Sequence, residues 1–274
     1  MNMNNKTVFI TGASSGIGLA TADLFWKAGW NVVATMRSPE RAGELLDRER
    51  TYVLALDVTD RESINQAVAK SIQRFGKIDV LINNAGYGLV GPFEPMPAEK
   101  IEKQFNTNVL GLMSVTQSLL PHFRGQKAGV IVNISSIGGR VTFPLYSVYH
   151  GTKWAVEGFT ESLSFELRPQ NIKVRLVEPG AIKTDFYGRS MDMIDTGGIK
   201  DYDRIIATAM PRMQSSGKNG ASPADVAKVI YRSATAKGWK LRYPAAGNAP
   251  AMLWLRRLIP VSWFMMAVRW SLLR

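Results

Sequence analysis

The chain has 274 residues, 46% of them hydrophobic, with 34 Lys or Arg against 22 Asp or Glu and a formal net charge of +12. This length and apolar content allow one sizeable buried core. With no Cys and 2 His, a disulfide scaffold and a Cys-based zinc site are excluded, and we expect no metal site.

Short apolar runs alternate with helical patterns from the N-terminus onward. The runs are continuous, which is typical of strands covered on both faces of a parallel sheet, and the alternation with helices indicates right-handed crossovers. We expect strands at 6–11, 31–35, 51–56, 79–84, 129–134, 173–178 and, at the sheet edge, 241–244. We expect helices from the Gly-rich turn to about 28, at 40–48, 60–75, 98–123 and 147–167, and from a capping box at Ser222 to about 235.

These elements predict an α/β fold with a Rossmann-like doubly wound parallel sheet of about seven strands and helices on both faces. No linker divides the chain, so residues 1–274 are expected to form a single domain. The N-terminus lacks the apolar region of a signal peptide, and no apolar run approaches the ~18 residues of a spanning helix. We therefore expect a cytoplasmic protein.

The first strand runs into TGASSGIG, residues 11–18. Glycines in such a turn let the backbone approach a pyrophosphate, and the next helix points its positive end at the phosphates. The spacing G-x-x-x-G-x-G differs from the common fingerprint but serves the same geometry. The alternative is that these glycines only form a tight turn and bind no ligand. We assign dinucleotide binding to Gly12, Ser14, Ser15, Gly16, Ile17 and Gly18.

The end of the second strand decides which dinucleotide is expected. NAD-binding proteins of this kind place an acidic residue there, whereas this chain has Arg37 and no acid between Ala34 and Ser38. A carboxylate would repel a 2′-phosphate, and a guanidinium can bind it with paired hydrogen bonds. We expect NADP(H), with Ser14 as a second contact. The alternative is that Arg37 is a solvated loop residue.

The stretch YHGTK places Tyr149 and Lys153 four residues apart on an expected helix, so both point into one site. A nearby ammonium lowers the phenol pKa from its usual value of about 10, which makes Tyr149 a usable acid–base group. Ser136 follows the strand 129–134 and can donate to a substrate carbonyl oxygen. His150 points off the shared face, and we expect it to be structural or solvent-exposed.

Further motifs occur in order: LDVTD around Asp57, NNAG at 83–86, NTNVLG around Asn108, NISS ending at Ser136 and EPGAIKT at 178–184. Over about residues 6–185 the chain resembles the short-chain dehydrogenase/reductase family. The residues Thr35-Met36-Arg37, after the second strand, resemble the corresponding segment of NADP-preferring hydroxysteroid and retinol dehydrogenases. The resemblance implies strand order 3-2-1-4-5-6-7 and NADP(H)-dependent hydride transfer between nicotinamide and a carbonyl or alcohol. It also implies a homodimer or homotetramer built through the helices at 98–123 and 147–167.

The same resemblance implies roles for individual residues. Tyr149 is the general acid or base, Lys153 binds the nicotinamide ribose and tunes Tyr149, and Ser136 polarises the carbonyl. Asn108 positions a water that links Lys153 to solvent. The inner residues of YHGTK depart from the family's usual Tyr-x-Ala-Ser-Lys, but the spacing is kept. Remaining cofactor contacts are Asp57 and Val58 at the adenine, Asn84, Ala85 and Gly86 at its ribose, and Pro179, Gly180, Ile182 and Thr184 at the nicotinamide.

The segment after EPGAIKT, at about 185–219, is expected to cover the substrate as a lid. Its Met and aromatic residues make an adaptable apolar wall, which implies an apolar ketone or aldehyde, such as a steroid, retinoid or lipid. Alternatively these residues form ordinary core. We assign substrate contacts to Ser136, Phe143, Tyr149, Phe186 and Tyr187.

The C-terminal extension, about 245–274, is basic and rich in Trp, and no acidic residue follows Asp225. Two short helices broken by Pro260 are expected. A peripheral membrane contact, a subunit contact and a flap over the substrate mouth all remain open interpretations. The cations are interleaved with Trp and Leu and form no dense run, so nucleic-acid binding is not expected.

Two other functions stay open beside the oxidoreductase. One is a regulator that binds NADPH without turnover. The intact set of Asn108, Ser136, Tyr149 and Lys153 argues against it. The other is a dehydratase or epimerase on the same fold, which would suit a longer chain better.

Overall fold

The computed structural model describes residues 5–183, 191–247 and 249–273. Its central sheet has seven parallel strands in the order β3-β2-β1-β4-β6-β7-β9, which confirms the predicted sheet and its order. The strands are β1 (Thr7–Thr11), β2 (Asn31–Met36), β3 (Thr51–Ala55), β4 (Val80–Asn83), β6 (Gly129–Ile134), β7 (Ile172–Pro179) and β9 (Arg242–Ala245).

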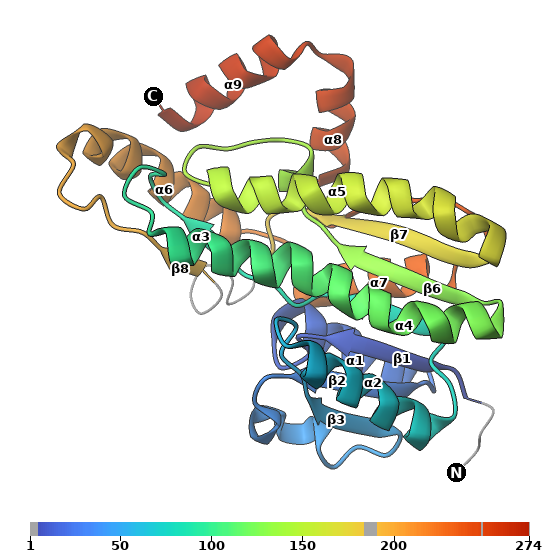
Figure 1. The fold of residues 1–274 in the computed structure, drawn as a ribbon. Coiled ribbons are helices and arrows are strands. Elements are labelled where there is room, and N and C mark those ends of the chain that lie inside the picture. Colours follow the sequence, from blue (N-terminus) through green and yellow to red (C-terminus); the bar gives the residue numbers. More distant parts are fainter. Residues whose placement is uncertain (1–4, 184–190, 248, 274) are drawn as a thin grey trace.

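Helices cover both faces of this sheet (Figure 1). Because neighbouring strand residues point to opposite faces, β1 serves two cores: Val8 and Ile10 pack in one, and Phe9 in the other. The first core includes buried side chains of α1 (Gly16–Lys27) and α7 (Pro223–Thr235). The second includes those of α2 (Arg61–Phe75), α4 (Leu112–Gln126) and α5 (Ser147–Leu167).

The strand order reverses between β1 and β4, so the connections leave the sheet on opposite sides there. Ligands of open parallel sheets bind in the crevice that this reversal creates at the carboxyl ends of the strands. The segments that follow β1, β2, β3, β4, β6 and β7 all start at this edge because every strand of the sheet is parallel. They carry most of the predicted site residues.

The helix predicted at 40–48 is wrong. Two separate 3₁₀ turns, Pro39–Arg41 and Gly43–Leu45, occupy this segment. Gly43 has a φ of 54°, a left-handed conformation that interrupts a right-handed helix. The charged composition suggested a helix, but the backbone conformation of Gly43 prevents a continuous α-helix in this segment.

The helix predicted at 98–123 is interrupted. It consists of α3 (Ala98–Phe105), a π-helical turn (Asn106–Gly111) and then α4, which runs to Gln126. Such π turns insert one extra residue into a helix and are frequent at functional sites. Here the inserted turn contains Asn108.

A second, two-stranded parallel sheet was not foreseen from the sequence. It pairs β5 (Gly88–Val90) with β8 (Met191–Met193). Within the described part of the expected lid, α6 (Asp203–Lys218) is also new. Strands of three residues are too short to show a sequence period, so they could be recognised only from their pairing.

The C-terminal extension forms the two predicted short helices, α8 (Ala249–Leu258) and α9 (Val261–Leu273), which are separated at Pro260. Figure 1 shows them in red, on the side of α5 away from β1, β2 and β3. Among the described residues, no helix combines the length and apolar character needed to cross a membrane.

Candidate active site

The glycine turn after β1 is held in shape by the segment after β4. Gly12 and Gly16 have φ values of 67° and 54°, which favour glycine. A Cβ on Gly18 would lie 2.1 Å from the Gly12 carbonyl oxygen, so no other residue fits there. The Asn84 amide donates to the carbonyl oxygens of Thr11, at 3.0 Å, and Gly12, at 2.9 Å. The turn is therefore a rigid backbone cradle at the point where strand order reverses.

This cradle fits a dinucleotide pyrophosphate. The helix α1 begins at Gly16, and the Ser15 side chain makes no capping bond to its first turn. No acidic residue lies in that turn. The amides and the positive end of the helix dipole are thus directed at the crevice, and neither a capping bond from Ser15 nor an acid in the first turn satisfies them.

The segments after β2 and β3 border the same crevice. Arg37 follows β2 directly and is exposed, and no carboxylate of the described residues forms an ion pair with it. Asp57 is half-buried, and its carboxylate accepts from the amide of Thr59 at 2.9 Å and from the Thr59 hydroxyl at 2.7 Å. Val58 is buried against Gly111, where a Cβ would approach it to 2.8 Å.

Tyr149 and Lys153 lie side by side on α5, as their spacing predicts. The Lys153 ammonium is 5.8 Å from the centroid of the Tyr149 ring. It also donates a buried hydrogen bond of 2.9 Å to the carbonyl oxygen of Ile134, at the end of β6. Burial lowers the pKa of Lys153 to about 8, while the Glu157 carboxylate opposes this shift.

Ser136 lies two residues after Ile134. The hydrogen bond from Lys153 to the Ile134 carbonyl therefore holds α5 close to the segment that carries this serine. Ser136 caps the 3₁₀ turn Ile137–Gly139, and its Oγ accepts from the Gly138 amide at 3.0 Å. That bond uses a lone pair and not the hydroxyl hydrogen. The serine is therefore oriented by the backbone and retains a donor.

His150 is structural, in line with one of the two expectations. It is buried, its ring stacks on Tyr146 with centroids 5.5 Å apart, and its Nδ1 accepts from the Phe143 amide at 3.3 Å. Burial lowers the pKa of His150 to about 4, so the ring is neutral at pH 7. A neutral ring suits its contacts with the two aromatic residues.

The side-chain amide of Asn108 makes three hydrogen bonds to protein groups. It donates to the Tyr87 carbonyl at 2.8 Å and to the Thr152 hydroxyl at 3.2 Å, and it accepts from the Tyr87 amide at 3.1 Å. Thr152 directly precedes Lys153. Asn108 therefore joins the loop after β4 to the helical turn that carries the lysine, and the predicted water relay stays a prediction.

The remaining predicted cofactor residues that the structure describes also lie at this edge. Ala85 donates its amide to the Thr11 hydroxyl at 3.1 Å, and Gly86 is exposed. Pro179 ends β7, Gly180 donates to the Ala245 carbonyl at 3.1 Å, and Ile182 is buried. Thr184, Phe186 and Tyr187 lie outside the described residues.

An apolar cluster lies against Tyr149. Phe143 and Tyr149 are half-buried and pack against it. Three of the methionines expected in the lid are buried there, while Met193 is 46% exposed. The buried members are Val90, Tyr146, Met191, Ala209, Met210 and Met213.

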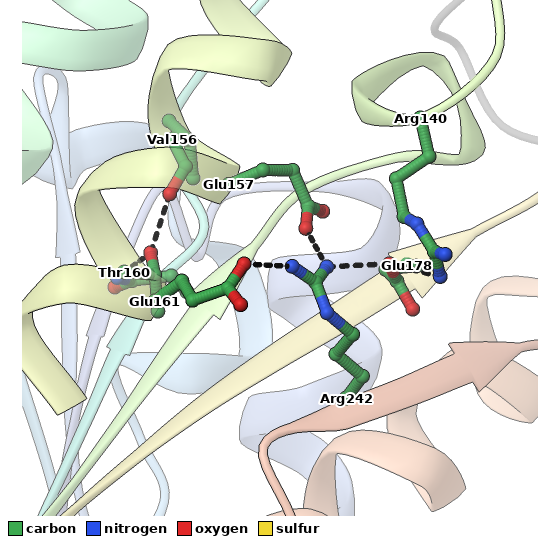
Figure 2. Close-up of polar contacts among 8 residues, drawn as sticks. Arg140, Val156, Glu157, Thr160, Glu161, Glu178 and Arg242 are labelled. Atoms are coloured by element: carbon green, nitrogen blue, oxygen red, sulfur yellow. Dashed lines mark hydrogen bonds and ion pairs between the residues drawn. The ribbon is translucent and has the colours of Figure 1, made fainter. Parts of the chain in front are cut away.

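A buried charge network lies one helical turn beyond Lys153, and the sequence did not reveal it. Figure 2 shows the Arg242 guanidinium of β9 between Glu157 of α5 and Glu178 of β7. Glu178 is also 3.6 Å from Arg140, which follows the turn begun by Ser136. Burial raises the pKa of Glu157 and of Glu178, against the attraction of Arg242. The only sequence signal was the four-residue spacing of Lys153 and Glu157.

The network connects three segments that carry site residues. Glu157 shares a helix face with Tyr149 and Lys153, and Glu178 directly precedes Pro179. These ion pairs lie next to Tyr149 and Lys153, and they hold α5, β7 and the turn after Ser136 in place relative to one another.

The fold and the arrangement of this site define a Rossmann-type oxidoreductase. The family model described as short chain dehydrogenase matches residues 6–194. A Bacillus subtilis protein named uncharacterized oxidoreductase YusZ is 37% identical over 270 residues, covering 95% of this chain and 96% of that protein.

Two solved structures are similar as well. A short-chain dehydrogenase from Streptomyces avermitilis has a TM-score of 0.82 and 33% identity, covering 98% of this chain and 94% of that one. ElxO with NADP bound has a TM-score of 0.74 and 32% identity, covering 90% and 99% respectively. The chain thus belongs to the short chain dehydrogenase family.

Proposed function

We propose that this protein catalyses NADP(H)-dependent interconversion of an apolar ketone or aldehyde with its alcohol. The observation that carries the proposal is the Lys153 ammonium, 5.8 Å from the Tyr149 ring. It is bonded to the Ile134 carbonyl, two residues before Ser136, at the same sheet edge as the glycine turn. Steroid-like, retinoid-like and other apolar carbonyl compounds are the substrates to test, with NADPH absorbance as the readout. Absence of turnover with all of them would leave an NADPH-binding regulator as the better account.

Bound nicotinamide supplies or accepts the hydride, and the protein manages the proton. In reduction, Ser136 donates a hydrogen bond to the carbonyl oxygen, on which negative charge develops. Tyr149 gives its phenolic proton to that oxygen. The Lys153 ammonium stabilises the phenolate that remains, because an adjacent cation favours the charged form. Oxidation runs through the same groups in reverse.

The proposed dinucleotide contacts follow the crevice from one end to the other. The glycine turn and α1 hold the pyrophosphate, and the ordered Asp57 carboxylate with Val58 flanks the adenine. Lys153 reaches the nicotinamide ribose. The other proposed contacts are Asn84, Ala85 and Gly86 at the adenine ribose and Pro179, Gly180, Ile182 and Thr184 at the nicotinamide.

Arg37 is proposed to select NADP(H) through the 2′-phosphate, with Ser14 beside it. The Arg37→Asp variant should raise the KM for NADPH by about 10- to 100-fold, because a charge-assisted bond is replaced by repulsion. The KM for NADH should change little. Arg41→Asp makes the same charge change at an exposed position four residues on and serves as the control. A native protein with lower KM for NADH than for NADPH would contradict the proposal.

Carbonyl reduction is expected to decline as pH rises through about 8, where Lys153 loses its proton. The neutral amine no longer stabilises a phenolate, so kcat/KM falls on the alkaline side. Glu157→Gln should move this decline to lower pH, because the Glu157 carboxylate favours the Lys153 ammonium. Glu161→Gln, an exposed carboxylate one further turn along α5, is the control. An unchanged profile in Glu157→Gln would contradict this coupling.

We also propose a homo-oligomer assembled through the π-helical turn, α4 and α5. Large apolar side chains remain exposed there: Leu110 at 53%, Trp154 at 48% and Phe165 at 74%. Contact with a second copy would remove them from water.

A further inference from the structure

The helices α8 and α9 expose an unusual number of large apolar side chains. Of the 17 such exposed residues in the described part of the chain, 8 lie between Trp254 and Trp270. The exposed fractions of Trp254, Trp263, Met266 and Trp270 are 65%, 65%, 68% and 63%. Soluble proteins rarely leave apolar groups this concentrated in water without a binding role.

These side chains form an outward face, distinct from the face that anchors the helices. Trp263, Met266 and Trp270 stand at positions i, i+3 and i+7 of α9, so they share one side of that helix. The anchoring side is different: Leu253 of α8 and Phe264 of α9 are buried in a cluster with Ile137 and Val141. The two helices thus bury one set of apolar side chains against the rest of the protein and expose a different set to solvent.

Basic side chains accompany the apolar ones. Arg256, Arg257 and Arg269 lie in these two helices, and the sequence contains no acid after Asp225. Within the described residues, no carboxylate pairs with any of the three. Arg256 is half-buried over the Phe264 ring of the anchoring side, at 5.6 Å, whereas Arg257 and Arg269 are exposed. The surface therefore combines indole rings, flexible apolar chains and unneutralised guanidinium groups.

This combination matches the boundary region of an anionic bilayer. Trp favours the depth of the headgroups, Met and Leu enter the acyl boundary, and Arg pairs with lipid phosphates. A second copy of the chain fits less well, since a two-fold contact would set arginines of like charge against each other. We propose that the outward face of α8 and α9 docks this protein onto an anionic lipid surface, with both helices lying in the interface.

A hollow borders this face, and Met266 and Arg269 belong to both. It gives the docking a functional consequence, which rests on the proposed function. It measures about 530 Å³ and lies between residues 142–144 and α9, with Met265, Met266 and Leu273 on its helical side. Phe143 lines it from the other side. Phe143 and Leu273 also pack against the same cluster as Tyr149. An apolar carbonyl compound dissolved in the bilayer would therefore meet the protein next to its proposed catalytic residues.

The docking can be tested by sedimentation of the full chain with sucrose-loaded vesicles, without reference to catalysis. Vesicles of phosphatidylcholine with phosphatidylglycerol should bind the protein, pure phosphatidylcholine should bind it far less, and added salt should weaken the binding. Tryptophan emission should shift to shorter wavelength on binding. Failure to bind the anionic vesicles would overturn the proposal even if the enzyme reduces carbonyl compounds.

Two variants separate the contributions of charged and of apolar side chains to vesicle binding. The charge variant R257Q/R269Q should weaken binding to anionic vesicles by about 10- to 30-fold. The apolar variant W263S/W270S should lose binding and the emission shift. Trp239→Ser removes another exposed indole, 40% exposed and outside these helices, and should bind normally. Equal binding by all three variants, or a reduced oligomeric mass of W263S/W270S without vesicle binding by the native chain, would contradict the proposal.

Discussion

Replacing Tyr149 with Phe is expected to lower kcat for carbonyl reduction by about 10²- to 10⁴-fold, the usual contribution of a positioned general acid. The substitution removes the phenolic proton and keeps the ring that packs against the apolar cluster beside it. NADPH binding should be nearly unchanged, because the glycine turn and Arg37 are on other elements. The measurement is steady-state reduction together with NADPH titration by fluorescence.

Tyr87→Phe is the matched control. Tyr87 follows β4 near the same site, but its buried hydroxyl has no hydrogen-bond partner among the described residues, so Phe at this position breaks no hydrogen bond that they make. Near-normal turnover in the Tyr149 variant would refute the assigned acid. Loss of both turnover and NADPH binding would point instead to a collapsed site. A native protein that binds NADPH but turns over no carbonyl compound would favour the regulatory alternative.

The sequence predicted the parts of this fold that depend on local pattern. Continuous apolar runs identified the strands of the main sheet other than the edge strand β9, since a strand covered on both faces leaves a contiguous signal. The position of Tyr149 beside Lys153 also followed from helical spacing alone. The prediction of a helix at 40–48 was wrong because Gly43 has a φ of 54°. The composition of the segment does not reveal that conformation.

Features made by distant segments could not be predicted. Arg242 contacts Glu157, which lies 85 positions earlier, and only the folded sheet brings β9 beside α5. The pairing of β5 with β8 joins Gly88–Val90 to Met191–Met193 across a similarly long stretch. Asn108 was foreseen through family resemblance, but its engagement with Tyr87 and Thr152 depends on the π-helical turn.

Arg242→Ala is expected to lower the free energy of unfolding at pH 7 by about 3 kcal/mol, the low end of the cost of removing one partner from a buried ion pair. Glu157 and Glu178 are almost entirely buried, and each has one oxygen without a hydrogen-bond partner among the described residues. They would lose their main counter-charge; Glu178 would keep Arg140 at 3.6 Å, and Glu157 would keep the weaker attraction of the Lys153 ammonium one turn away. Urea unfolding measures the loss.

The exposed member of the network provides the control. Glu161 is 2.8 Å from the Arg242 guanidinium, but its side chain is 55% exposed, so water solvates it when the arginine is present or absent. Glu161→Gln should therefore cost less than about 1 kcal/mol, as is typical of surface pairs. A cost for Glu161→Gln equal to that of Arg242→Ala would contradict the claim that burial sets the effect.

The dependence on pH distinguishes unpaired buried carboxylates from lost packing. Burial already raises the pKa of Glu157 and Glu178 above the ordinary value of 4.5, and loss of the guanidinium raises both further. Between the unfolded and folded pKa the native state binds more protons than the unfolded chain, so its stability falls as pH rises. The deficit of Arg242→Ala should accordingly shrink at pH 5 and grow at pH 8. Combining Arg242→Met with Glu157→Gln and Glu178→Gln should recover much of the loss, since neither buried carboxylate is then left without a counter-charge. A deficit that stays constant with pH and survives this triple substitution would mean that the Arg242 side chain acts through packing instead.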